Sequence, residues 1–76
     1  MNTFTSKLKD LETLGERREF EIEENRDTSL TTKEYNTLKE DLIKNHPDDI
    51  LDEVEGRDEL GIHRSQALDD LYKSIN

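Results

Sequence analysis

The sequence predicts an all-α fold, a single small domain over residues 1–76 with three to four helices. Apolar residues recur every three or four positions in several separate segments, the spacing that places them on one face of a helix. Only 29% of the residues are hydrophobic, so the expected core is small. Such a core closes within three or four helices, or it is completed by a homodimer through the first helix.

The first predicted helix runs from Thr3 to about Asn25. Its apolar stripe consists of Phe4, Leu8, Leu11 and Ile22, with Leu14 at the edge. Gly15 interrupts the stripe, where it costs about 1 kcal/mol relative to alanine. Phe20 points to the opposite side. Two readings stay open: the helix breaks near Gly15, or one long helix uses two faces and Phe20 contacts another surface.

The second predicted helix begins at Thr31, because Glu34 follows at the spacing of a capping box. Leu30 and Tyr35 occupy the two positions of a hydrophobic staple. The residue before a proline avoids helical backbone angles, so His46 before Pro47 ends this helix. Its buried face is expected to contain Tyr35, Leu38 and Leu42, with Ile43 beside it.

Pro47 opens a short third helix, since proline suits the first helical position. Gly56 is its expected stop. The last helix covers roughly Ser65 to Ile75, with Ser65 as its cap. The expected core residues of these segments are Ile50, Leu51, Val54, Leu60, Ile62, Leu68, Leu71, Tyr72 and Ile75.

Charge is the dominant feature of the composition. Twenty acids stand against eleven bases, so the formal net charge is −9. Direct binding of nucleic acid by the whole surface is disfavoured, because phosphate contacts need clustered Lys and Arg. Anionic membranes are disfavoured for the same reason. A basic protein is the expected partner, and attraction would mainly speed the encounter.

Cysteine is absent, which excludes disulfides, thiolate zinc sites and cysteine nucleophiles. The longest uninterrupted apolar run has two residues, so neither a signal peptide nor a membrane span is expected, and the default location is the cytoplasm. The two histidines, His46 and His63, lie on different elements and predict no metal site. No glycine-rich phosphate loop occurs, and no cofactor or catalytic residue is predicted.

An acidic run occupies residues 48–59, where seven acids against Arg57 give −6. These acids are Asp48, Asp49, Asp52, Glu53, Glu55, Asp58 and Glu59. A calcium loop does not fit, because counting back from Gly56 places Leu51 at the first ligand position. The run is either a solvated face or a surface that binds a basic protein. A second expected patch consists of Glu19, Glu23 and Glu24, with Phe20 as an apolar anchor.

The segment from Leu60 to Leu68 resembles the turn and second helix of a helix-turn-helix unit. In that motif a glycine makes the turn and an apolar residue follows it into the core, as Gly61 and Ile62 would here. The resemblance implies that His63, Arg64 and Gln66 would reach DNA bases. Acidic residues follow at once, however, at Asp69 and Asp70.

The function expected from the sequence is non-enzymatic. The chain is interpreted as a protein-binding module or inhibitor that presents an acidic helical surface to a basic, nucleic-acid-binding host protein. In its sharpest form it is a DNA mimic, whose carboxylates imitate backbone phosphates, and its composition is similar to that of phage-encoded inhibitors. The alternatives are a small helix-turn-helix-like transcription regulator and a helical oligomerisation unit.

Overall fold

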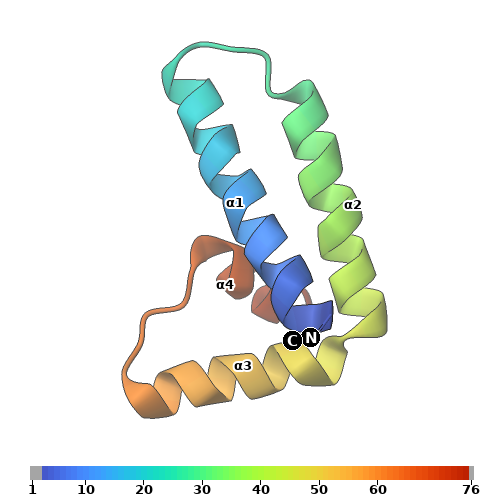
Figure 1. Ribbon diagram of the computed structural model, residues 1–76, viewed down its shortest axis with the longest axis vertical. Helices are drawn as coiled ribbons and strands as arrows, with labels where there is room; N and C mark the ends of the chain where they lie inside the picture. Colours follow the sequence, from blue (N-terminus) through green and yellow to red (C-terminus); the bar gives the residue numbers. More distant parts are fainter. Residues whose placement is uncertain (1–2, 76) are drawn as a thin grey trace.

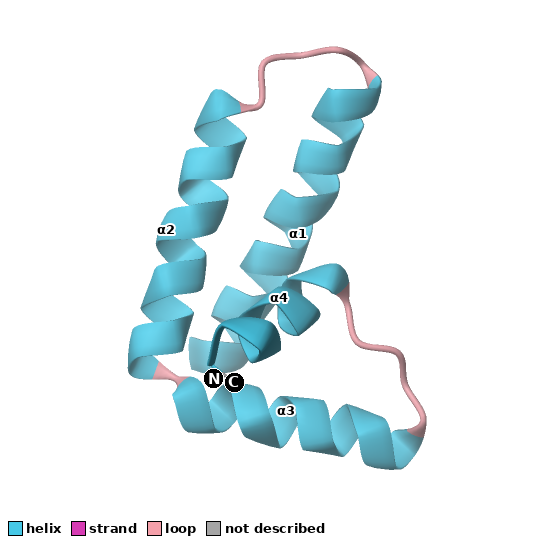
Figure 2. Cartoon of the chain, turned by 180° about the vertical axis from the view of Figure 1, so that it is seen from behind, coloured by secondary structure: helices cyan, strands magenta, loops and turns pink. Residues whose placement is uncertain are grey.

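The computed structural model describes residues 3–75, in which every regular element is a helix. α1 (Thr3–Glu23) and α2 (Ser29–Asn45) lie side by side and antiparallel, and α3 (Pro47–Leu60) crosses beneath one end of this hairpin (Figure 1). α4 (Gln66–Ile75) packs on one face of the hairpin near the same end, as the view from behind shows (Figure 2). The prediction of an all-α fold with three to four helices is therefore confirmed, and the number of helices is four.

The core lies where the four helices meet. Its fully buried side chains come from all four helices and are Leu11, Leu42, Ile50, Leu68 and Leu71. Ile22 was predicted to belong to this core, but it is 56% exposed. The reason is that α4 covers only the part of the hairpin nearest α3 (Figure 2). The far half of α1 and α2 consequently has no third layer in the described part of the chain.

α1 is continuous through Gly15, so the single-helix reading is correct. Gly15 faces the ring of Tyr35 on α2, and a Cβ added at this glycine would lie 3.5 Å from the Cε2 atom of Tyr35. That distance is ordinary van der Waals contact. The helix continues because a glycine costs only about 1 kcal/mol within a helix that tertiary packing supports.

The start of α2 differs from the predicted capping box. The helix begins at Ser29, and Thr31 is buried inside it. Thr28 is the N-cap and makes no side-chain capping bond, whereas Oδ1 of Asp27 accepts hydrogen bonds from the backbone N–H (2.9 Å) and the hydroxyl (2.6 Å) of Ser29. These bonds lower the pKa of Asp27. The predicted staple is also wrong, since Leu30 is exposed.

The junction between α2 and α3 is as predicted, with α2 ending at Asn45 and Pro47 at the start of α3. The ring of His46 lies at this junction, with its centroid 5.8 Å from that of Phe4. Lys7 on α1 donates to Asp41 on α2 over 2.7 Å, and this hydrogen bond lowers the pKa of Asp41. These contacts attach the first turn of α1 to the end of α2.

The end of α3 corrects another prediction, because the helix passes through Gly56 and continues to Leu60. Gly61 ends it in the left-handed conformation, at φ 70°. The N–H of Ile62 donates to the carbonyl of Arg57 over 2.9 Å, which closes the end of the helix. Leu51, Leu60 and Ile62 were expected in the core, but all three are exposed. For Leu60 and Ile62 the reason is that the last turn of α3 extends past the other helices (Figure 1).

The start of α4 confirms its predicted cap. The backbone N–H of Leu68 donates to the hydroxyl of Ser65 over 3.2 Å. Leu68 and Leu71 are buried, and Tyr72 and Ile75 pack against the core, as the spacing predicted.

Across residues 3–75, no helix combines the length and apolar character that crossing a bilayer requires.

Candidate functional site

The seven acids of residues 48–59 divide into two sets on α3. Three of them are engaged by bases of the same chain. Oδ2 of Asp49 lies 3.0 Å from Nδ1 of His46, and Oε1 of Glu53 lies 3.8 Å from Nη2 of Arg57. Asp58 accepts from Nη2 of Arg64 over 2.9 Å. These three carboxylates therefore contribute to the structure of the domain, and arginines partly neutralise the charges of Glu53 and Asp58.

The other four acids form a row that we call the α3 stripe: Asp48, Asp52, Glu55 and Glu59. All four are exposed, and none has an ion pair among residues 3–75. Their spacing is i, i+4, i+7 and i+11, which keeps them within about 60° around the helix and spans about 16 Å. Ile50 and Val54 on the opposite side are buried. The stripe therefore points away from the core into solvent.

A row with the same spacing occurs on α1, and we call it the α1 stripe: Glu12, Glu16, Glu19 and Glu23. The last three are exposed and have no ion pair within the described range 3–75. Glu19 and Glu23 were predicted as site residues, whereas Glu12 and Glu16 were missed. The i, i+4, i+7, i+11 spacing was the signal that could have identified them. Glu24, the third predicted acid, follows the end of the helix.

The two stripes do not merge into one face, because α1 and α3 cross (Figure 1). Arg57 connects the α1 stripe to α3 at one point. Its Nη1 lies 3.6 Å from Oε2 of Glu12 on α1, and its Nη2 faces Glu53 on α3. This arginine pairs with the first member of the α1 stripe, whereas the other three members have no ion pair among residues 3–75.

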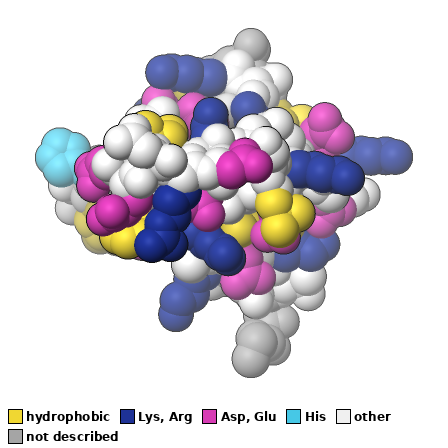
Figure 3. Space-filling view, turned by 90° about the horizontal axis from the view of Figure 1, so that it is seen from above, with side chains coloured by type: hydrophobic (Ala, Val, Ile, Leu, Met, Phe, Trp, Pro, Cys, Tyr) yellow, Lys and Arg dark blue, Asp and Glu magenta, His cyan; other side chains and the backbone are white. Residues whose placement is uncertain are grey.

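Phe20 lies outside the core and is 51% exposed. The guanidinium of Arg26 lies 5.6 Å from the centre of its ring, a cation–π contact. Viewed from the end that carries the α1–α2 connector, acidic, basic and hydrophobic side chains alternate over the surface (Figure 3). The predicted second patch therefore has a base, Arg26, beside its aromatic residue, Phe20.

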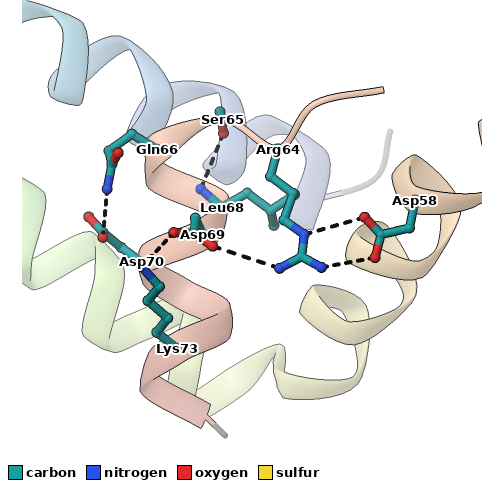
Figure 4. Close-up of polar contacts among 8 residues, drawn as sticks. All are labelled: Asp58, Arg64, Ser65, Gln66, Leu68, Asp69, Asp70 and Lys73. Carbon is teal, nitrogen blue, oxygen red and sulfur yellow. Dashed lines mark hydrogen bonds and ion pairs between the residues drawn. The ribbon is translucent and has the colours of Figure 1, made fainter. Parts of the chain in front are cut away.

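Figure 4 shows two of the side chains that the helix-turn-helix resemblance implied, Arg64 in the turn between α3 and α4 and Gln66 at the start of α4. Arg64 donates to both carboxylate oxygens of Asp58, from Nε over 3.4 Å and from Nη2 over 2.9 Å. The hydrogen bond to Asp58 raises the pKa of Arg64. Its guanidinium also lies 4.7 Å from the ring centre of Tyr72. Gln66 is engaged as well, since it donates to Asp70 over 3.1 Å.

This geometry differs from the expected DNA-reading turn in two respects. Gly61 makes the turn as predicted, but Ile62 is 52% exposed and does not enter the core. Of the three side chains expected at bases, Arg64 and Gln66 are bound within the chain, and only His63 is exposed without such a contact among residues 3–75. The turn consequently serves to join α3 to α4.

The part of the chain that the structure describes contains no group of three or more His, Asp or Glu side chains arranged to hold a metal ion. The acids of both stripes lie in rows along one face of a helix, and within residues 3–75 none of them belongs to such a group. The arrangement suits contact with an extended, positively charged surface.

Comparison with protein-family models, with curated proteins and with solved structures found no match to the chain.

Proposed function

We propose that this chain is a non-enzymatic protein-binding module that acts in the cytoplasm. It presents the α3 stripe to a basic, nucleic-acid-binding protein and blocks or modulates that protein. The observation that carries the proposal is the row formed by Asp48, Asp52, Glu55 and Glu59, which are exposed, aligned and without ion pairs among residues 3–75.

The spacing of the stripe supports DNA mimicry as the form of this binding. Four carboxylates over about 16 Å give one charge per about 5 Å along the helix. One strand of duplex DNA carries a phosphate for about every 3.4 Å of its axis. A groove lined with Lys and Arg would therefore meet a comparable, somewhat sparser row of negative charge. A phage-type inhibitor that occupies a DNA-binding groove would work in this way.

The repulsion within the stripe supports a binding role as well. Like charges at i, i+4 destabilise a helix by a few tenths of a kcal/mol per pair. The stripe contains no base that would relieve this repulsion. A cationic partner would relieve it on binding, and the net charge of −9 would steer the encounter.

Affinity capture from bacterial lysate tests the proposal. The immobilised chain is incubated with nuclease-treated lysate, washed at low and at high salt, and the retained proteins are identified by mass spectrometry. We expect a basic protein that is retained at low salt and lost at high salt. Duplex DNA added to the wash should release it if the two compete for one groove.

A pair of variants with the same net charge assigns the binding to the stripe. The first carries Asp52→Lys, Glu55→Lys and Glu59→Lys on α3. The control carries Asp10→Lys, Glu34→Lys and Glu40→Lys, which are exposed and outside both stripes. Only the first should lose the retained protein while both keep their helical circular dichroism. Equal retention by the two variants would sink the assignment to the α3 stripe.

A further inference from the structure

A groove with a volume of about 790 Å³ lies between α1 and the first turn of α4. Gly15 and Ile22 of α1, the ring of Tyr35 on α2 and Ala67 of α4 supply its apolar lining. It adjoins the far half of the hairpin, which α4 does not cover (Figure 2). A third helix laid along α1 at this place would cover Ile22, which is now largely exposed.

The charged lining of the groove is mainly acidic. Its four carboxylates are those of Glu12, Glu16, Glu19 and Asp70, whereas its two bases are Lys9 and Arg18. The three glutamates belong to the α1 stripe and follow one another at i, i+4 and i+7 along one wall. Apolar lining beside a regular row of carboxylates is complementary to an amphipathic helix with Lys or Arg at the same spacing.

We propose that this groove binds a basic amphipathic helix of the partner protein. An aliphatic side chain of that helix lies over Gly15 and Ile22, and its Lys or Arg residues pair with Glu16 and Glu19. The inference rests on the proposed function in taking the partner to be basic. It uses a surface separate from the α3 stripe, so the two can fail independently.

A synthetic peptide of 16 residues serves as the probe. It carries Lys at positions 1, 5, 8 and 12 and Leu at positions 4 and 11, on an alanine–glutamine background. The control peptide has the same composition with these residues scattered around the helix. In an ¹⁵N-resolved NMR titration of the full chain, we expect the patterned peptide to shift the amides of Gly15, Glu16, Glu19, Ile22 and Ala67.

Matched variants separate the apolar from the ionic part of the groove. Ile22→Ser should weaken the patterned peptide by about tenfold, the effect of losing one aliphatic anchor. Leu30→Ser, at an exposed aliphatic residue of α2 outside the groove lining, should change the affinity less than about twofold. Glu16→Lys with Glu19→Lys should also weaken binding by about tenfold, whereas Glu34→Lys with Glu40→Lys, of equal charge, should not. Arg18→Gln, which removes a base from the lining, should tighten it.

The outcomes distinguish the two proposals. The proposal for the groove is overturned if both peptides bind equally or if the chemical-shift changes fall on the α3 stripe. It is also overturned if the groove amides shift with the concentration of the chain alone, because a second copy would then be the occupant. Lysate capture that is lost only in the α3 stripe variant would leave the proposed function standing and remove the groove. If the patterned peptide binds at the groove but the chain captures no basic protein from lysate, the proposed function is overturned. The groove would then remain a site for a basic helix.

Discussion

Tyr35 on α2 donates its hydroxyl to Oδ2 of Asp70 on α4 over 2.8 Å, although the tyrosine is only 5% exposed. The bond joins two helices that lie far apart in the sequence, and it satisfies the one polar atom that the tyrosine brings into the core. Gln66 holds the other carboxylate oxygen of Asp70 over 3.1 Å. This bonded group fixes the start of α4 against the hairpin and so shapes one end of the groove.

Tyr35→Phe should lower the free energy of unfolding by about 1 kcal/mol, the net value of one such hydrogen bond. The loss stays small because Asp70 retains its bond from Gln66. Chemical denaturation at neutral pH measures it. Tyr72→Phe is the matched control, since the hydroxyl of Tyr72 makes no hydrogen bond within residues 3–75 and its ring still faces Arg64. Equal effects of the two substitutions would contradict a role for the Tyr35 hydroxyl.

Stability should also fall at alkaline pH because of Tyr35. Burial and then the neighbouring carboxylate of Asp70 raise the pKa of Tyr35 well above its usual range. The unfolded chain ionises this phenol near pH 10, whereas the folded chain keeps it protonated, so the unfolded state binds fewer protons and stability decreases as the pH rises. Denaturation curves between about pH 9 and pH 11 should show a steeper loss for the wild type than for Tyr35→Phe. Parallel curves would argue against a raised pKa.

Gly56 and Gly61 should respond to alanine with opposite signs. Gly56 lies inside α3, and a Cβ added there meets no atom within 4 Å, so Gly56→Ala should stabilise the chain by about 0.5–1 kcal/mol. Gly61 has a φ of 70°, which an L side chain adopts at a cost of about 1–2 kcal/mol, so Gly61→Ala should destabilise it. Thermal unfolding of the two variants measures both effects. Shifts of the same sign would contradict the position of the helix end.

These two glycines show how far the sequence predicts the fold. Pro47 has a fixed φ angle that suits the first position of a helix, and the hydroxyl of Ser65 accepts from a backbone N–H of the first turn. Both helix starts were therefore predicted correctly. A glycine only permits a helix to end, so neither Gly56 nor Gly61 could be preferred without knowing how far α3 extends. Ile22 was placed in the core for a related reason. Its spacing matches the stripe of α1, but whether it is buried depends on the reach of α4.

The candidate site was predictable in composition and only partly in arrangement. The acids of α3 and their regular spacing can be read directly from the sequence. Which of them are neutralised depends on the fold, because Arg64 reaches back to Asp58 only once Gly61 has turned the chain. Arg57 reaches Glu12 across an interface between helices that are distant in the sequence. The groove beside the α1 stripe was not predictable, since it requires the packing of α4 on α1.

The stability of the turn between α3 and α4 should depend on Arg64, which pairs with acids of both helices. Arg64→Gln removes the two hydrogen bonds to Asp58, the approach of Nη1 to Asp69 at 3.7 Å and the cation–π contact with Tyr72. We expect a lower midpoint of thermal unfolding and faster amide exchange at Ile62 and Leu68, which flank the turn. The difference from the wild type should shrink in high salt, because partly exposed ion pairs are screened.

Two further variants interpret that result. Arg17→Gln makes the same change of charge, but within residues 3–75 Arg17 has a single ion pair, with Glu21 on its own helix at 3.7 Å, so the unfolding midpoint of this variant should move less. Arg64→Lys keeps the charge and loses the planar fork that meets both oxygens of Asp58, so it should recover part of the loss. If Arg17→Gln lowered the midpoint as much as Arg64→Gln, net charge would explain the effect. The link between α3 and α4 would then have to come from their apolar side chains in the shared core, among them Ile50, Val54 and Leu68.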